Sequence, residues 1–387
     1  MATTATVETI RAVLDEAYPP RLAESWDRVG LICGDPGAKV DKVAFALECT
    51  QEVAERAVAI GADMLVVHHP LLLRGTSTVA ADTPKGKVLH TLIRGGVALF
   101  AAHTNADSAR PGVNDRLAEL LGVHPGAPIV AAEDAGGAAL LDHWGVHVPP
   151  ADLKKVTDAL FAAGAGEVGD YSHCAFAVEG TGQFRPEQGA DPTEGEVGEL
   201  HSAEETRVVF TAPRARRRQL ITALRAAHPY EEPAFDIVEM APTGDPEKLP
   251  GLGRVGELDR PMPLKEFVQR VADRLPETVW GVRAAGDPER IVRRVAVSSG
   301  AGDSFLDAVR GLDVDVYVTS DLRHHPVDEY LRAGGPAVVD TAHWASEFPW
   351  TGQAAELIAG RTGVATEIIG LRTDPWTLSA HPANPEA

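Results

Sequence analysis

The sequence predicts an α/β protein made of two similar α/β halves, with an α+β domain of the ferredoxin-like type inserted between them. Landmarks in the first third of the chain recur in the same order in the last third, and short apolar runs alternate with amphipathic segments in both. The middle segment follows a different order. A length of 387 residues fits two or three domains. We assign residues 1–130 and 251–387 to the two halves of one core and residues 137–246 to the insert.

The N-terminal half is predicted to alternate helices and strands. Met64–Val67 is apolar without alternation, which is typical of a strand buried on both faces of its sheet. The elements expected, in order, are a helix over 6–18, the landmark Gly34-Asp35-Pro36, a strand over 42–48, a helix over 51–62, a strand over 64–67, a helix over 86–96 and a strand over 97–103.

The C-terminal half repeats this order, which indicates an internal repeat of roughly a hundred residues. Repeated strand–helix–strand units imply a largely parallel or mixed sheet covered by helices, so we expect two such halves to face each other across a cleft. The elements expected are a helix over 263–275, the landmark Gly286-Asp287-Pro288, a strand over 293–299, a helix over 303–312, a strand over 314–320, the motif His324-His325-Pro326, a helix over 327–335 and a strand over 337–340.

The insert is predicted to have the order β-α-β-β-α-β of a ferredoxin-like domain. Its central loop, residues 180–199, is rich in Gly and Pro, and we expect it to be mobile. The basic cluster Arg214 with 216–218 opens the second helix, and we interpret it as a solvated face in preference to a phosphate-binding patch. The strands are expected near 140–148, 174–180, 206–212 and 234–240, and the helices over 151–164 and 216–228.

Composition excludes several classes of protein. The formal net charge of −20 lacks the basic footprint that nucleic-acid phosphates require. No apolar run approaches the roughly 20 residues of a membrane span, and residues 1–20 have neither the basic nor the apolar region of a signal peptide. Cys33, Cys49 and Cys174 form no CxxC motif and no disulfide framework. We therefore expect a cytoplasmic protein that binds neither nucleic acid nor membranes.

Two adjacent histidines, His68 and His69, follow the buried strand 64–67. Neighbouring side chains of an extended chain point to opposite sides, so the two imidazoles can reach two neighbouring ions instead of chelating one. Ligand sites in α/β sheets lie at the carboxyl ends of strands, where this pair is placed.

Two further strand ends carry residues of the same kind. His343 and Glu347 are four apart, so on a helix they share one face, and a carboxylate there can bridge two ions. His103 and Asp107 follow the strand over 97–103. The alternative for His343 and Glu347 is that they are solvated side chains at the end of a strand and bind no metal. His, Asp and Glu without Cys suit Zn, Mn, Fe(II), Ni or Co. Together these features predict a dinuclear metal site in the core.

Other motifs leave alternatives open. Gly251–Gly256 matches GxGxxG literally, but no strand precedes it and no helix follows, so we do not interpret it as a dinucleotide site. Residues 298–304 form either a tight turn, which we favour, or a phosphate cradle. His325 could be a ligand, a remnant of the repeat or, as we favour, an acid or base beside the metals. His103 could likewise be a ligand or move protons, and we favour a role in which it orients a ligand.

At this point the chain resembles the NGG-interacting-factor-three-like family, the GTP cyclohydrolase 1 type 2 homologues. The resemblance implies a two-metal centre with Glu347 bridging, a toroidal homohexamer, and a PII-like insert as in longer bacterial members. At the position where members often carry Gly-Glu or Gly-Asp, this chain has Ser320-Asp321. By position the implied ligands are His68, His69, Asp107, His343 and Glu347. The matching stretches are Ser25–Leu31, Val67–Leu71, His103–Asp107, Ser298–Gly302 and Asp340–Glu347, with Gly164–Tyr171 and His228–Glu232 in the insert.

The leading functional prediction is a divalent-metal-dependent hydrolase in which two ions activate a water molecule toward a nucleotide. Taken literally, the family name implies hydrolysis at C8 of GTP, which opens the imidazole ring and releases formate, with His325 or His103 moving protons. Cleavage of phosphate esters or anhydrides is the first alternative. A non-enzymatic metal-handling or regulatory protein, in which the insert senses a small ligand, is the second.

Overall fold

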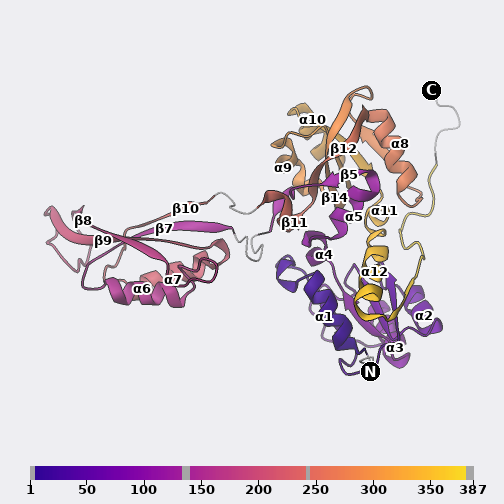
Figure 1. Ribbon diagram of the computed structural model, residues 1–387, viewed down its shortest axis with the longest axis horizontal. Helices are drawn as coiled ribbons and strands as arrows, with labels where there is room; N and C mark the ends of the chain where they lie inside the picture. The colour runs from indigo at the N-terminus through magenta and orange to yellow at the C-terminus, as the bar shows by residue number, and fades with distance from the viewer. Residues whose placement is uncertain (1–4, 133–139, 241–244, 381–387) are drawn as a thin grey trace. The chain divides into compact units, whose positions relative to one another are not determined.

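The structure, a computed structural model, describes residues 5–132, 140–240 and 245–380. The chain divides into two compact units (Figure 1). Met1–Ala132 and Pro246–Ala387 together form the core, and Glu133–Asp245 forms the insert. Within the described residues, no helix is long and apolar enough to cross a membrane.

The first sheet of the core has five strands in the order β1-β4-β3-β2-β17. The inner strands pair in parallel, and β1 joins β4 antiparallel. The strands are β1 (Gly30–Cys33), β2 (Lys42–Ala46), β3 (Met64–Val67), β4 (Ala98–Ala101) and β17 (Ala365–Ile368).

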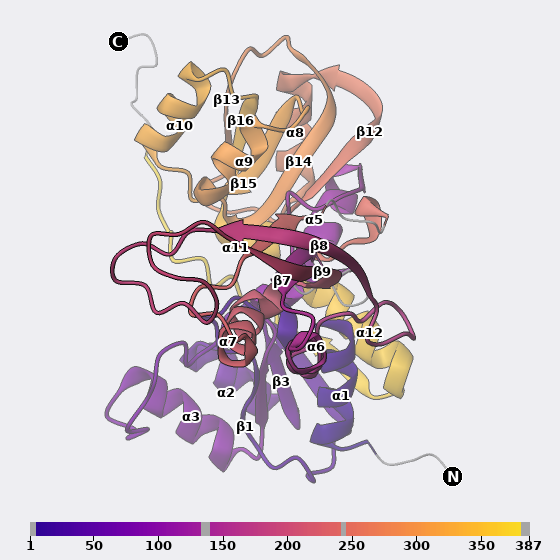
Figure 2. The ribbon, with the colours of Figure 1, turned by 90° about the vertical axis from the view of Figure 1, so that its left-hand side faces the viewer.

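Helices cover both faces of this sheet, which is why its strands are continuously apolar. Side chains of one parity pack with α1 (Val7–Ala17) and α12 (Trp350–Thr362). Side chains of the other parity pack with α2 (Gln51–Ala59) and α3 (Pro84–Arg94). Figure 2 shows the two helix pairs on opposite sides of the sheet. Threonine side chains cap the first turns of α1, α2 and α3, because each accepts a hydrogen bond from a backbone N–H there.

The second sheet has six strands in the order β13-β16-β15-β14-β12-β5. Its first four positions correspond to β1-β4-β3-β2, with the same antiparallel edge strand and the same parallel pairs. This correspondence agrees with the repeat predicted from the sequence. The strands are β5 (Val123–Pro125), β12 (Arg254–Pro263), β13 (Val282–Ala285), β14 (Ile291–Ala301), β15 (Val316–Ser320) and β16 (Ala337–Thr341).

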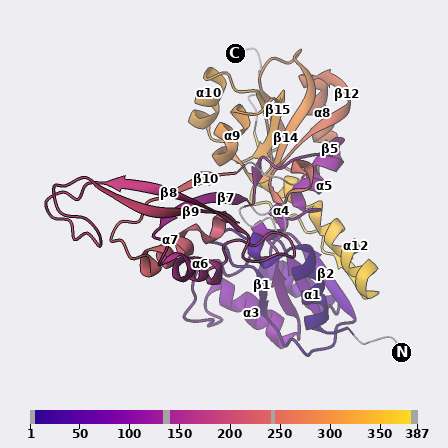
Figure 3. The ribbon, with the colours of Figure 1, turned by 60° about the vertical axis from the view of Figure 1, so that its left-hand side comes forward.

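The second sheet is also covered on both faces. One face packs with α5 (Val113–Leu121) and α8 (Leu264–Arg274), and the other with α9 (Leu306–Arg310) and α10 (His324–Arg332). Figure 3 shows α8 on one side of β14 and β15, with α9 and α10 on the other. The short elements of the core are η1 (Pro20–Leu22), α4 (Thr104–Ser108), β6 (Val130–Ala131), η3 (Pro246–Lys248), β11 (Gly251–Leu252), η4 (Asp303–Phe305) and α11 (His343–Glu347).

The two halves exchange segments, which the sequence did not predict. β17 and α12, from the C-terminal part, complete the first sheet, whereas β5 and α5, from the N-terminal part, extend the second. The assigned halves 1–130 and 251–387 therefore correspond to the two sheets only in part, because the segments that follow the repeat cross over to the opposite sheet.

The insert has the order β-α-β-β-α-β and a four-stranded antiparallel sheet in the order β10-β7-β9-β8, the arrangement of a ferredoxin-like fold. Arg217 and Arg214 of the basic cluster are ion-paired with Asp142 and Glu239, so these two arginines tie the second helix to the sheet. The elements are β7 (Leu141–Val148), α6 (Leu153–Ala162), β8 (Ala175–Phe184), β9 (His201–Pro213), η2 (Arg214–Arg216), α7 (Arg217–Ala227) and β10 (Phe235–Glu239).

Candidate metal centre

The predicted metal ligands follow the carboxyl ends of strands from both sheets of the core. His68 and His69 come directly after β3, and the backbone N–H groups of both donate to the carbonyl of Leu47 at the end of β2. Asp107 lies in α4, which is separated from β4 by two residues. His343 and Glu347 are the first and last residues of α11, just beyond β16.

The other four side chains converge on the carboxylate of Glu347. Glu347 Oε2 lies 2.9 Å from His69 Nε2 and 3.2 Å from His343 Nε2, and Oε1 lies 3.7 Å from His68 Nε2. Asp107 Oδ1 is 3.7 Å from the same nitrogen of His68. Two sets of three ligand atoms with Glu347 in common result, one with His68 and Asp107 and one with His69 and His343. A third set joins His68 and His69 to His103.

Each imidazole of the cluster is oriented by an acceptor at its Nδ1. His68 Nδ1 lies 2.8 Å from the carbonyl of Ala102, and His69 Nδ1 lies 3.1 Å from Glu48 Oε1. His343 Nδ1 lies 2.7 Å from Asp321 Oδ2. A neutral imidazole whose Nδ1 donates a proton presents a lone pair at Nε2, which is the arrangement that metal-binding histidines use.

Two ligand atoms at the centre of the cluster have no hydrogen-bond partner. His68 Nε2 and Glu347 Oε2 are buried and make no hydrogen bond. Lone pairs of nitrogen and oxygen that face each other in a buried space repel unless a proton or a metal ion lies between them, and such unpaired buried polar atoms cost about 1–3 kcal/mol each. This donor set of imidazoles and carboxylates, without a thiolate, fits a divalent ion of intermediate hardness.

The pKa values of the histidines and of Glu347 are shifted in the directions that favour positive charge beside the Glu347 carboxylate. The charge of Glu347 outweighs burial and, with Asp321, raises the pKa of His343 to about 11. Burial lowers the pKa of His69, but the carboxylates of Glu347 and Glu48 overcome it and raise the pKa to about 10. Burial would raise the pKa of Glu347, yet His343, His69 and His68 hold it well below its usual range.

Residues 298–301 pack beside the cluster as the last part of β14, and the predicted tight turn is confined to residues 302–305, where the Phe305 N–H donates to the Gly302 carbonyl. The Ser299 N–H donates to Asn114, and the Gly300 N–H donates to Ser346 Oγ, so neither is available to an anion. Gly300 has a φ of 61°, and a Cβ on it would lie 2.3 Å from Glu347 Oε1. Only glycine therefore leaves room for the carboxylate.

The cluster opens into a cavity of about 520 Å³. Asp107, His343 and Glu347 line it, as does His103. The His103 ring centroid lies 5.2 Å from that of His68, and its Nδ1 is 2.9 Å from Asp27 Oδ1. This arrangement brings the His103 ring beside the predicted metal ligands, with its Nδ1 held by Asp27.

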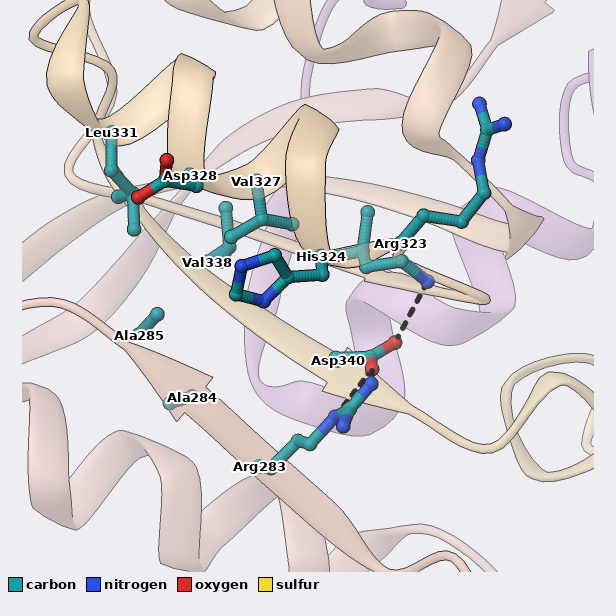
Figure 4. A pocket seen from close by; sticks show the side chains of 11 residues that line it. Arg283, Ala284, Ala285, Arg323, His324, Val327, Asp328, Leu331, Val338 and Asp340 are labelled. Carbon is teal, nitrogen blue, oxygen red and sulfur yellow. Dashed lines mark hydrogen bonds and ion pairs between the residues drawn. The ribbon is translucent and has the colours of Figure 1, made fainter.

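The repeat motif His324-His325-Pro326 lies outside the cluster. The sequence placed it in a loop before a helix, but it forms the first turn of α10, where Pro326 is tolerated because no N–H is needed there. Both histidines are exposed, and their rings contact each other. His324 lines a separate cavity of about 370 Å³ with Arg283 and Asp340 (Figure 4).

His325 lines neither this cavity nor the cavity of the metal cluster. Asp340, which begins the motif that contains His343, is also turned away from the cluster, because its carboxylate is ion-paired with Arg283 at 2.6 Å.

Three acceptors of the centre were missed or undervalued by sequence reasoning. Asp27 accepts from His103 and from the Thr104 N–H, and these hydrogen bonds overcome burial and hold its pKa well below its usual range. Glu48 orients His69 and also accepts from Thr373, near the C-terminus. Asp321 orients His343. Glu48 ends the predicted strand over 42–48, and Asp27 lies in the matching stretch Ser25–Leu31, so each had a usable signal in the sequence.

Comparisons with known proteins identify the family of this chain. A model of the family described as Duf34/NIF3 (NGG1p interacting factor 3) matches residues 5–375. The chain belongs to this family. The resemblance stated from the sequence is therefore confirmed.

Relatives and solved structures of the family cover nearly the whole chain. Proteins named GTP cyclohydrolase 1 type 2 homolog from Mycobacterium tuberculosis and Bacillus subtilis are 53% and 35% identical to it, over 95% and 98% of this chain and 95% and 100% of theirs. A Bacillus cereus protein described as related to NIF3 has a solved structure with a TM-score of 0.63 and 32% identity, over 98% of this chain and all of that one. The mixed α/β architecture is thus that of the family.

Proposed function

We propose that this protein is a divalent-metal-dependent hydrolase that acts on a nucleotide. The observation that carries the proposal is the convergence of three oriented imidazoles and two carboxylates whose inner atoms, His68 Nε2 and Glu347 Oε2, are buried without hydrogen bonds. The name of the relatives makes GTP the first nucleotide to test.

The residues divide into two metal-binding sets. His68 and Asp107 would hold one ion, His69 and His343 would hold the second, and Glu347 would serve both. Two divalent ions bound there would lower the pKa of a water molecule and would polarise the substrate group that this water attacks.

His103 is the residue best placed to move a proton. Asp27 fixes its Nδ1 and thereby its tautomer, so its Nε2 is free to accept or donate a proton within the cavity. The sequence also nominated His325 for this role, but its exposed position on α10 gives no route to the cluster, so the geometry favours His103.

The test combines metal analysis of the purified chain with release of formate and phosphate from GTP, other nucleotides and phosphoesters. Glu347→Ala should lose both ions, because a shared carboxylate contributes to each. His103→Ala should keep the metals but slow turnover by roughly 10²–10⁴-fold, the usual contribution of a positioned acid or base. His325→Ala and the exposed His124→Ala serve as matched controls and should retain wild-type turnover.

Two outcomes would contradict the proposal. A full metal complement in Glu347→Ala would remove the shared-ligand assignment. No turnover of any nucleotide or phosphoester by the fully metallated wild type would replace hydrolysis with metal handling, in which the same ligands take up and release ions.

A further inference from the structure

The cavity above the metal cluster has an aromatic wall that the metal ligands do not explain. Trp26 lines this cavity with 54% of its surface exposed, although the next residue, Asp27, is only 5% exposed. The Trp26 ring stands edge-on to His103, with centroids 5.9 Å apart and an interplanar angle of 79°. Phe305 of η4 contributes a second aromatic side chain to the lining.

The exposed indole is held in place by its neighbour. Asp27 accepts hydrogen bonds from His103 and from the backbone of Thr104, so the backbone that carries Trp26 is anchored to the same histidine that faces the metals. A large aromatic face left open beside a reactive centre is a typical platform for a planar ring, because such stacking removes apolar surface from water on both partners.

The charges that line the cavity limit the negative charge of the ligands that can bind there. Among the described residues, no lysine or arginine lines it, whereas Glu24, Asp107 and Glu347 each bring a carboxylate. Two divalent ions would offset the charges of these three carboxylates and leave about one positive charge, which a single phosphate group of charge −1.5 to −2 already neutralises. A triphosphate would add further negative charge beside Glu24 with no side chain to compensate it.

We propose that Trp26 forms the base-stacking platform of this site and that the site takes a nucleoside or nucleoside monophosphate in preference to a triphosphate. This inference rests on the proposed function, because the metal ligands define one end of the binding site. It adds that Trp26 stacks on the base of the ligand and that ligands with fewer phosphate groups bind more tightly.

The experiment measures binding of guanosine, GMP, GDP and GTP to the full-length, Zn-loaded protein by titration calorimetry at low ionic strength. The base is constant in this series and only the charge changes. Ribose 5-phosphate, which lacks the purine base, is the further probe. Affinity should fall at least tenfold from GMP to GTP, and ribose 5-phosphate should bind more weakly than GMP.

Variants at Trp26 test the platform directly. Trp26→Ala should weaken guanosine and GMP by about 5- to 100-fold, the usual effect of removing a stacked ring, whereas Trp26→Phe should restore most of the affinity. Trp376→Ala is the matched control, because Trp376 is exposed to a similar extent, 57%, and does not line the cavity. Metal content should stay unchanged in all three variants.

The outcomes separate this inference from the proposed hydrolase. GTP binding as tightly as GMP, or unchanged GMP affinity in Trp26→Ala, would overturn the inference even if hydrolysis is observed. The predicted binding series without turnover would sustain the ligand class while overturning hydrolysis.

Discussion

A methyl group added at Gly300 would collide with the candidate metal centre. The φ of Gly300, 61°, is costly for any other residue, and its missing Cβ leaves the space that Glu347 Oε1 occupies. The sequence showed a Ser-Ser-Gly-Ala-Gly stretch between a strand and a helix, but the reason for the glycine lies in another element, α11.

Gly300→Ala should therefore lower metal content sharply as well as stability. Gly281→Ala is the matched control, because Gly281 has a φ of 67° but no atom within 4 Å of the added Cβ. Both substitutions should cost about 1–3 kcal/mol of unfolding free energy from the left-handed backbone. Only Gly300→Ala should displace Glu347. Equal metal content in the two variants, measured by elemental analysis, would show that Glu347 tolerates the methyl group.

Metal binding should depend on pH well above the ordinary range of histidine. In the metal-free protein the pKa values of His69 and His343, about 10 and 11, keep both rings protonated at pH 7, and ions must displace these protons. Because the pKa values are raised, affinity should keep rising as pH increases from 7 to 9, by roughly 10- to 100-fold per unit. Titration calorimetry in buffers of different ionisation enthalpy should find about two protons released. An affinity that levels off above pH 7 would contradict this.

At the scale of elements, a buried ion pair joins α5 to β12. Arg254 is fully buried and donates to both oxygens of Asp115, at 2.8 and 2.7 Å. The same guanidinium donates to the carbonyls of Gly251, Gly253 and Ala109. The literal GxGxxG motif therefore spans β11 and the start of β12, where two of its carbonyls accept from the buried arginine, and it does not form a nucleotide-binding turn.

Asp115→Ala should destabilise the core strongly. It would leave the Arg254 charge buried without its partner, which typically costs about 3–5 kcal/mol. The exposed pair Arg361–Glu16, which joins α12 to α1, provides the control, and Glu16→Ala should leave the thermal midpoint nearly unchanged. Calorimetric midpoints of the two variants give the comparison. Similar midpoints would mean that the buried pair contributes no more than the surface pair.

At the scale of the whole molecule, the chain leaves the core for the insert and re-enters it at one place. β6 pairs antiparallel with β11, and the Ala132 N–H donates to the carbonyl of Pro250 at 3.0 Å. The core residues on either side of the insert are thus adjacent, and a short linker can join them.

Replacing Glu133–Asp245 with a short Gly/Ser linker should leave a soluble core that binds the same amount of metal. All five predicted ligands and the cavity residues belong to the core unit, which has its own apolar clusters on both sheets. Size-exclusion chromatography and metal analysis, with the intact chain as reference, provide the measurement. Aggregation or loss of metal would show that the core depends on the insert.

The sequence by itself determined the family, the repeat and the strand ends that carry His68, His69, Asp107, His343 and Glu347. These are local patterns: an apolar run followed by polar residues places them at the carboxyl end of a strand, where parallel sheets gather ligands.

Only the tertiary structure decided which acceptors orient the histidines, and that His103, not His325, lies at the cluster. It also decided that β17 and β5 exchange between the sheets. Pairing between segments far apart in the chain depends on which surfaces pack together, and the periodicity of a single segment carries no information about its distant partner.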